Sequence, residues 1–308
     1  MEIHLEAVER LRFADRTPVR AASGIAPFGD GFLVVQDDST HAAWLHGDDV
    51  TAVRLLPAVD GLDLFDEASG TKHLKPDLEA ACAIEVAGAP ALLALGSGSS
   101  PHRMRWSCVR LRDGRPSAVG ADLTVLYGAV ADALSVRPEL LNMEGACVVG
   151  DSLRWYHRGL PSAGLPSGSV DLHLSQAVAA VLGREDVASM TVTNPRSYDL
   201  GEVAGIGLAV TDAVALPGGS ILLSAAAEDS PNPRDDGPVV ASALVRLDGP
   251  AVVDVTSLPQ VDGRVSKVEG LMVLDAGATQ VRLLAVVDAD DPAAPSLAIR
   301  LGVRGLAG

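Results

Sequence analysis

The chain has 308 residues, 48% hydrophobic but only 3% aromatic, and 40 acidic against 24 basic residues give a formal net charge of −16. This charge argues against a nucleic-acid partner, because a phosphate backbone is bound through lysine and arginine. No segment approaches the roughly 20 apolar residues of a membrane span, and the N-terminal residues lack a signal-peptide pattern. We therefore expect a cytoplasmic protein that binds neither nucleic acid nor membrane.

Five segments, taken in chain order, share one pattern. Each has a small or acidic pair, an apolar run, a turn with Gly or Asp, and a second apolar run that ends in polar residues. They begin near residues 23, 78, 143, 211 and 268. Each predicts a β-hairpin, and a weaker pair of short strands follows it. Four short strands at a period near 60 residues are typical of propeller blades.

Aligning the five segments stacks one polar residue from each near the start of the first strand. The intervals along this column are 56, 65, 68 and 57 residues, and a small residue follows each member. The column consists of Ser23, Glu79, Glu144, Asp212 and Glu269. We expect the innermost strands of the blades to bring these side chains to the central channel.

Closure of the ring can be judged by counting. The last unit, from Glu269 to Gly308, has room for about three strands, and the N-terminal stretch IHLEAVERLRF lies outside every unit. Sharing one blade between both termini removes open edges. We predict one all-β domain over residues 1–308, a single β-propeller with five blades favoured over six and the N-terminal strand closing the last blade. The longer intervals predict short helical insertions near residues 121–135 and 174–186, the first with Asp122 as its N-cap.

Two motifs carry a family resemblance. The segment NMEGA followed by GD and a short strand, and the segment KVEGL that opens the last unit, resemble uncharacterised bacterial β-propeller proteins. Those proteins are distantly similar to esterase-like phytase propellers. The resemblance, which spans about residues 23–290, implies a propeller with acidic channel residues and implies little about the reaction.

Carboxylates crowded into one channel need a counter-charge. At 5 Å and an effective dielectric constant near 20, each pair of carboxylates costs about 3 kcal/mol. Two of only three lysines in the chain, Lys75 and Lys267, lie four and two residues before Glu79 and Glu269. A structural Lys/Glu network is therefore one alternative. The second is bound Ca²⁺ or Mg²⁺, because these ions prefer oxygen ligands, with Glu79, Glu144, Asp212 and Glu269 as the metal ligands. The third is that the carboxyl groups are protonated or solvated.

A second polar set follows the second strand of each hairpin, and the sequence does not decide at which end of the channel it lies. We expect a small-molecule ligand to be bound by Asp37, Ser97, His102, Arg103, Lys75 and Lys267. The candidate catalytic residues are Glu144, Asp212, His157 and Arg158: carboxylates as general bases, the imidazole as proton carrier and the guanidinium as substrate anchor.

Three functions fit this pattern. The first is a propeller hydrolase or lyase that acts on a small molecule in the channel, with a divalent cation activating water. The second is a non-catalytic propeller that binds a small ligand or a protein. In the third, the acidic column is purely structural and joins neighbouring blades through backbone amides. Oligomeric state is not readable from the sequence.

Overall fold

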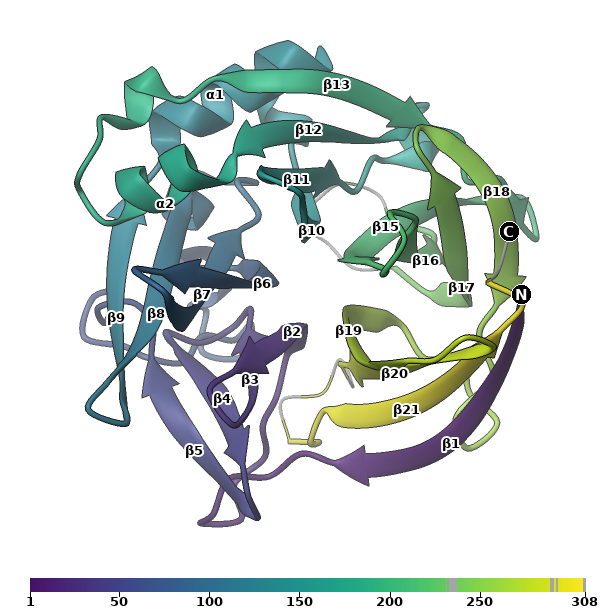
Figure 1. Ribbon diagram of the computed structural model, residues 1–308, viewed down its shortest axis with the longest axis horizontal. Helices are drawn as coiled ribbons and strands as arrows, with labels where there is room; N and C mark the ends of the chain where they lie inside the picture. Colours follow the sequence, from purple (N-terminus) through teal and green to yellow (C-terminus); the bar gives the residue numbers. More distant parts are fainter. Residues whose placement is uncertain (231, 233–236, 289–290, 292, 307–308) are drawn as a thin grey trace.

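The computed structural model describes residues 1–230, 232, 237–288, 291 and 293–306. Its strands form five antiparallel sheets arranged as blades around a central axis (Figure 1). Neighbouring innermost strands contact one another all the way round, in the order β2, β6, β10, β15, β19 and back to β2. The prediction of a single all-β propeller with five blades is confirmed.

The blades follow one another along the chain. Blade 1 contains β2 (Ala22–Phe28), β3 (Gly31–Gln36), β4 (His41–His46) and β5 (Asp49–Arg54). Blade 2 contains β6 (Leu78–Val86), β7 (Ala89–Gly96), β8 (Arg105–Arg112) and β9 (Arg115–Asp122). Blade 3 contains β10 (Met143–Val149), β11 (Ser152–His157), β12 (Ser167–His173) and β13 (Val192–Tyr198).

The last two blades depart from this pattern. Blade 4 has a short additional strand and contains β14 (Glu202–Val203), β15 (Ile206–Ala215), β16 (Ile221–Glu228), β17 (Val239–Asp248) and β18 (Ala251–Ser257). Blade 5 contains β19 (Val268–Ala276), β20 (Gln280–Val287), β21 (Leu297–Arg304) and, as its outermost strand, β1 (Glu2–Arg10).

Pairing of the two termini closes the ring, as the count of strands predicts. β1 runs antiparallel to β21, from the pair Glu2 and Arg304 to the pair Arg10 and Leu297. The purple N-terminal strand therefore lies beside the yellow C-terminal strand in Figure 1. This arrangement leaves β21 with a partner on each side, which protects its edge.

Two α-helices pack beside blade 3, α1 (Thr124–Leu134) and α2 (Leu174–Val181). α1 contacts β12 and β13, and α2 lies between blades 2 and 3, where it contacts β8, β9 and β12. The connections between the strands of the described residues contain five single-turn 3₁₀ helices. These are η1 (Lys72–Leu74), η2 (Pro101–Arg103), η3 (Pro138–Leu140), η4 (Pro161–Ala163) and η5 (Val187–Ser189). The prediction of Asp122 as the N-cap of the first helix is wrong by one residue, because Leu123 takes that position. The Asp122 carboxylate still accepts the backbone N–H of Thr124 at 2.9 Å. No helix among the described residues is long and apolar enough to cross a membrane.

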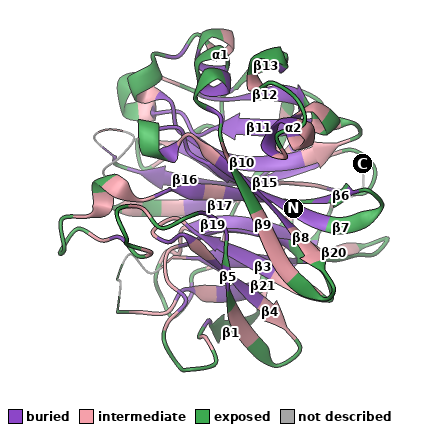
Figure 2. Ribbon diagram, turned by 90° about the vertical axis from the view of Figure 1, so that its left-hand side faces the viewer, coloured by how far each residue is buried: buried purple, intermediate pink, exposed green. Residues whose placement is uncertain are grey.

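The core fills the spaces between blades. Buried residues follow the inner strands, and exposed residues gather on outer strands and loops (Figure 2). Small residues after the channel column allow the inner strands to approach closely. A Cβ added to Gly145 would lie 2.7 Å from the Cα atom of Asp212 in the next blade, a separation that real Cβ atoms essentially never show. The small residue at this place is therefore a packing requirement of the ring.

Gly145→Ala is expected to destabilise the protein by about 1–3 kcal/mol, because the new methyl group overpacks the contact between blades 3 and 4. Gly128→Ala in α1 is the matched control, since a Cβ there meets nothing within 4 Å. The control should be neutral or should stabilise by up to about 1 kcal/mol. Urea unfolding measures both variants, and equal effects would contradict the backbone contact.

Candidate functional site

Five inner strands, one in each blade, carry a β-bulge, which lies close to the start of β2, β6, β10 and β19 and in the middle of β15. Pairing with the second strand slips there, so that one residue of the inner strand has no partner in the register. The five residues left out are Ser23, Glu79, Glu144, Thr211 and Glu269. The three carboxylates of this set, Glu79, Glu144 and Glu269, are called the channel glutamates below.

Blade 4 corrects the alignment made from the sequence. The spacing predicts Asp212 as its channel residue, but Thr211 takes that place and Asp212 pairs with Ser224. Asp212 is 2% exposed, and its Oδ2 accepts the backbone N–H of Leu271 in blade 5 at 2.7 Å. Burial raises the pKa of Asp212 well above its ordinary value. The geometry makes Asp212 a contact between blades and not a member of the channel set.

The two polar sets predicted from the sequence lie at the same end of the channel. Backbone hydrogen bonds connect them from blade to blade. Asp77 N–H donates to Asp37 O at 3.0 Å, Ser97 N–H donates to Asp77 O at 2.9 Å, and Met143 N–H donates to Ser97 O at 2.8 Å. Residues that follow a second strand therefore lie beside the entry of the next innermost strand.

The first polar cluster of this mouth joins blades 1 and 2, and we call it the Lys75 cluster. The Lys75 ammonium contacts the carboxylate of Asp37 and lies 2.5 Å from Oδ1 of Asp77. Oδ2 of Asp77 accepts Arg103 Nη1 at 2.9 Å and also the hydroxyl of Ser97. The cluster consists of Asp37, Lys75, Asp77, Glu79, Ser97 and Arg103.

The second cluster joins blades 3, 4 and 5, and we call it the Lys267 cluster. Lys267 Nζ lies 2.9 Å from both Glu228 and Glu269. Arg158 lies 2.7 Å from Glu228 and 3.5 Å from Glu144, and the Asn142 amide donates to Glu144 at 2.5 Å. The cluster consists of Asn142, Glu144, Arg158, Glu228, Lys267 and Glu269.

The channel glutamates differ from Glu228 in their protonation. Burial, Asp77 and Glu144 raise the pKa of Glu79 well above its ordinary value, and Glu79 forms no hydrogen bond with any described residue. Burial raises the pKa of Glu269 to about 8, against the lowering effect of Lys267. Burial also raises the pKa of Glu144, opposed by Arg158 and Lys267. In contrast, the cations around Glu228 outweigh its burial and bring its pKa to about 2.

Formal charges in the two clusters balance only if protons are added. The clusters together hold six carboxyl groups, Asp37, Asp77, Glu79, Glu144, Glu228 and Glu269, and four cations, Lys75, Arg103, Arg158 and Lys267. Two protons on the six carboxyl groups would make the formal charge of the two clusters zero, and the groups with raised pKa values are Glu79, Glu144 and Glu269. Acidic repulsion is thus relieved by lysine, arginine and two protons.

An acidic group with metal-ligand spacing is present in the Lys75 cluster. Oxygen atoms of Asp37, Asp77 and Glu79 lie within 4.8 Å of one another, a donor set suited to Ca²⁺ or Mg²⁺. The Lys75 ammonium already contacts two of these three carboxylates. A metal ion would therefore have to displace Lys75, so the donor set fits an ion only after a side-chain rearrangement.

The predicted proton carrier, His157, is neutral at pH 7. His157 is 1% exposed, and its Nδ1 lies 2.9 Å from Asn142 O. Burial lowers the pKa of His157 to about 4, so the ring is neutral, and its Nε2 has no partner in the described part of the chain. His102 is exposed in η2, next to Arg103 of the Lys75 cluster.

Asp77 is one of three cluster residues that the expected site residues did not include, beside Asn142 and Glu228. It contacts Lys75, Arg103 and Ser97 and is 2% exposed. The signal was present in the segment KPDLE, where Asp77 stands midway between Lys75 and Glu79. It lies just before the strand that defines the repeat, so the column did not include it.

A cavity of about 540 Å³ adjoins the Lys75 cluster at the rim of the mouth, and Asp37 and Lys75 form part of its wall. Asp38, also in the wall, has its pKa raised to about 7 by burial and by Asp37. Arg20 lies 2.5 Å from Asp38 and opposes that shift. The rim cavity therefore offers further polar groups beside the channel glutamates.

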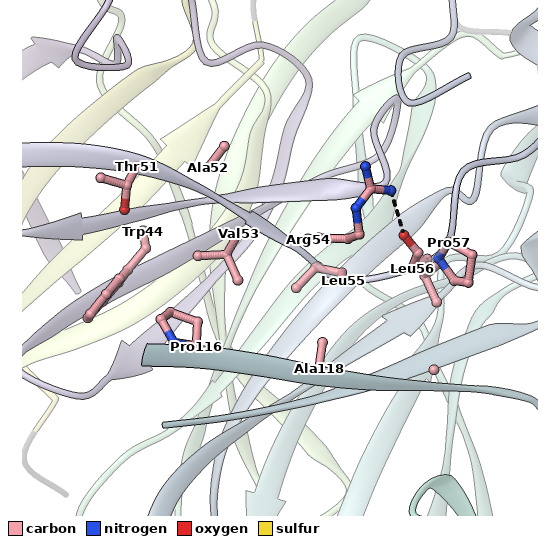
Figure 3. A pocket seen from close by; sticks show the side chains of 11 residues that line it. Trp44, Thr51, Ala52, Val53, Arg54, Leu55, Leu56, Pro57, Pro116 and Ala118 are labelled. Carbon is pink, nitrogen blue, oxygen red and sulfur yellow. Dashed lines mark hydrogen bonds between the residues drawn. The ribbon is translucent and has the colours of Figure 1, made fainter. Parts of the chain in front are cut away.

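A separate groove of about 600 Å³ lies between the outer strands of blades 1 and 2 (Figure 3). Trp44, Val53 and Leu56 line one wall, and Pro116 and Ala118 of β9 line the other. None of its lining residues belongs to either polar cluster. This groove has a mixed polar and apolar lining and is distinct from the channel mouth.

The comparisons with known proteins agree with the fold. A family model described as a family of unknown function, DUF6910, matches residues 71–292, and no curated protein matches the chain. An α-L-arabinofuranosidase from Podospora anserina, solved in complex with cellotriose, is 11% identical. The match covers 96% of this chain and 94% of that one, with a TM-score of 0.51.

Two further solved structures are similar at lower TM-scores. A gluconolactonase from Xanthomonas campestris is 12% identical, with 92% of this chain and 72% of that chain covered and a TM-score of 0.41. A protein of unknown function from Dyadobacter fermentans is also 12% identical, with 98% and 99% covered and a TM-score of 0.42. At these identities the likeness concerns the fold alone.

Proposed function

We propose that this chain, which belongs to the DUF6910 family of unknown function, is a hydrolase that cleaves a small molecule at the mouth of its channel by acid–base catalysis. The observation that carries the proposal is the set of three channel glutamates, which come from three blades and meet at one mouth. The likeness to esterase-like phytase propellers stays a prediction, and the proposal does not depend on it.

Glu79 and Glu144 are the proposed acid and base. Glu79 has a strongly raised pKa and no hydrogen-bond partner among the described residues, so its proton is free for a leaving group. Glu144 accepts Asn142 and faces Arg158, and both contacts favour its carboxylate form. Burial raises the pKa of Glu144 as well, but Arg158 and Lys267 oppose that shift. We therefore assign Glu144 as the base and Glu79, whose pKa is raised well above its ordinary value, as the acid.

The proposed substrate is a neutral molecule with a glycosidic bond. A carboxylic acid that protonates the leaving oxygen, opposite a carboxylate that activates water, is the pair that glycoside hydrolysis uses. The mouth is neutral when Glu79 and Glu269 are protonated, so it does not favour a highly charged ligand. The fold shared with an arabinofuranosidase is consistent with this class and does not specify the sugar.

Divalent-cation catalysis is the second candidate, favoured by the three carboxylates of the Lys75 cluster. Asp37, Asp77 and Glu79 would hold Ca²⁺ or Mg²⁺, which would supply a water molecule of lowered pKa. We rank it second because Lys75 already neutralises two of the ligands.

The proposal is tested with a panel of 4-nitrophenyl glycosides, both furanosides and pyranosides, in buffer with EDTA and in buffer with CaCl₂ or MgCl₂. Release of nitrophenol that persists in EDTA supports acid–base catalysis. Activity that is lost in EDTA and restored by either ion supports the metal-dependent reaction instead. Failure to cleave any glycoside in all three buffers contradicts the proposed function.

A further inference from the structure

Glu228 lies at the centre of the Lys267 cluster although it is not a channel glutamate. Its side chain is 1% exposed, and each carboxylate oxygen accepts two donors. Oε1 accepts the Ser230 hydroxyl at 2.7 Å and the Gly237 N–H at 2.9 Å. Oε2 lies 2.7 Å from Arg158 Nη2 and 2.9 Å from Lys267 Nζ.

Each of the two cations that Glu228 binds is shared with one channel glutamate. Lys267, from blade 5, also contacts Glu269 at 2.9 Å. Arg158, from blade 3, also lies 3.5 Å from Glu144. Glu228 itself ends β16 of blade 4. Three blades therefore contribute to one arrangement, in which the Glu228 carboxylate binds two cations that also contact Glu144 and Glu269.

We propose that Glu228 is a positioning residue of the site, which holds Arg158 and Lys267 where they act on Glu144 and Glu269. Its four acceptor positions are filled, so it has none left for a substrate or a proton. The ionised state of Glu228 follows from these contacts, and its pKa of about 2 agrees with them. This inference rests on the acid–base function proposed above. It states that Glu228, through Arg158 and Lys267, determines the protonation of Glu144 and Glu269.

The charged groups around the channel glutamates give the direction of the effect. Glu269 faces Lys267, Glu144 and Arg158. Glu144 faces Arg158, Lys267, Asp77 and Glu228. Without the charge of Glu228, Lys267 has Glu269 as its remaining contacting carboxylate. The full attraction then favours the ionised form of Glu269, so the pKa of that group should fall.

Infrared spectroscopy measures this without a substrate, because a protonated carboxyl group has its own C=O stretching band. In the wild-type protein a band is expected to titrate with a midpoint of about 8 and to be missing in Glu269→Gln. In Glu228→Gln the midpoint should move down by at least about one pH unit, as expected when a cation is no longer shared. An unchanged midpoint in folded Glu228→Gln would overturn the inference.

Two further variants separate positioning from a merely structural role. Glu228→Asp keeps the charge and should keep the midpoint within about half a unit of the wild type. If Glu228→Gln does not fold, the double variant Glu228→Gln/Lys267→Met removes the unpaired ammonium. Arg158, which also faces Glu269, is then released from Glu228, so the midpoint should lie below that of Lys267→Met alone. An equal or higher midpoint in the folded double variant would overturn the inference. If the glycoside panel gives no turnover while these midpoints move as expected, only the proposed function fails.

Discussion

Glu144→Gln is expected to lower kcat by about 10²- to 10⁴-fold while the protein stays folded. The amide has the shape of the carboxylate and can still accept the Asn142 hydrogen bond, which measures 2.5 Å in the wild type. Arg158 retains its contact of 2.7 Å with Glu228, so no buried cation is left unpaired. The amide cannot take up a proton, however, and the activation of water is lost. Turnover of whichever nitrophenyl glycoside is cleaved measures the effect, with circular dichroism to monitor the fold.

Glu79→Gln should cause a loss of similar size, because it removes the proposed acid. Glu85→Gln is its matched control, since Glu85 lies on the same strand but is exposed, and it should leave kcat unchanged. If Glu144→Gln unfolds the protein, the column is structural and latches the blades together. A folded Glu144→Gln with wild-type turnover would exclude Glu144 as the base.

The architecture was predictable because the spacing and composition of the hairpins in the sequence show the repeat. Five hairpins at intervals of 56 to 68 residues predict the blades, and a last unit that is one strand short predicts its completion by the N-terminal strand. The pairing of β1 with β21 confirms that argument. Such long-range closure can be predicted because an open propeller would leave unpaired strand edges.

The site was predictable only in part, and the β-bulges explain why. A bulge shifts the register by one residue, so an alignment by spacing selected Asp212 where the structure places Thr211. Thr211 and Asp212 are equally acceptable as the channel residue from the sequence, since each is polar and stands near a small residue. Only the pairing of β15 with β16 distinguishes the channel position from the contact between blades.

The charge balance of the mouth also depends on contacts that no sequence pattern contains. The closeness of Lys75 to Glu79 and of Lys267 to Glu269 along the chain indicates a Lys/Glu network. The structure adds that Lys75 is bound mainly by Asp37 of the preceding blade and by Asp77. Lys267 is likewise bound by Glu228, which is 39 residues away. These partners are determined by the order of blades around the ring, so they follow from the closed fold and not from local spacing.

Asp77→Asn is expected to destabilise the protein by about 3–5 kcal/mol, because it removes the negative charge that two buried cations share. The Asp77 side chain is 3% exposed, and those of Lys75 and Arg103 are 12% and 6% exposed. Lys75 would keep only Asp37 as a contacting counter-ion, and Arg103 would keep the Ser99 hydroxyl at 2.9 Å. Urea unfolding at pH 7 measures the free energy of unfolding.

Asp63→Asn is the matched control, because the Asp63–Arg54 pair is also an aspartate–arginine contact, at 2.8 Å, but its side chains are 38% and 49% exposed. Water screens that pair, so its loss should cost less than about 1 kcal/mol. Comparable losses in the two variants would contradict the structural role of the Lys75 cluster.

The pH dependence of the stability of Asp77→Asn gives an independent test. Lys75 and Arg103 hold the pKa of Asp77 well below its ordinary value of 3.8, against the effect of burial. A carboxyl group whose pKa is lowered by folding stabilises the protein above its unfolded pKa and loses that contribution as the pH falls. The wild type should therefore lose stability progressively below about pH 4, whereas Asp77→Asn lacks this part of the loss. The difference in unfolding free energy between the two proteins should narrow from pH 7 to pH 3, and a constant difference would show that Asp77 acts through its shape and not through its charge.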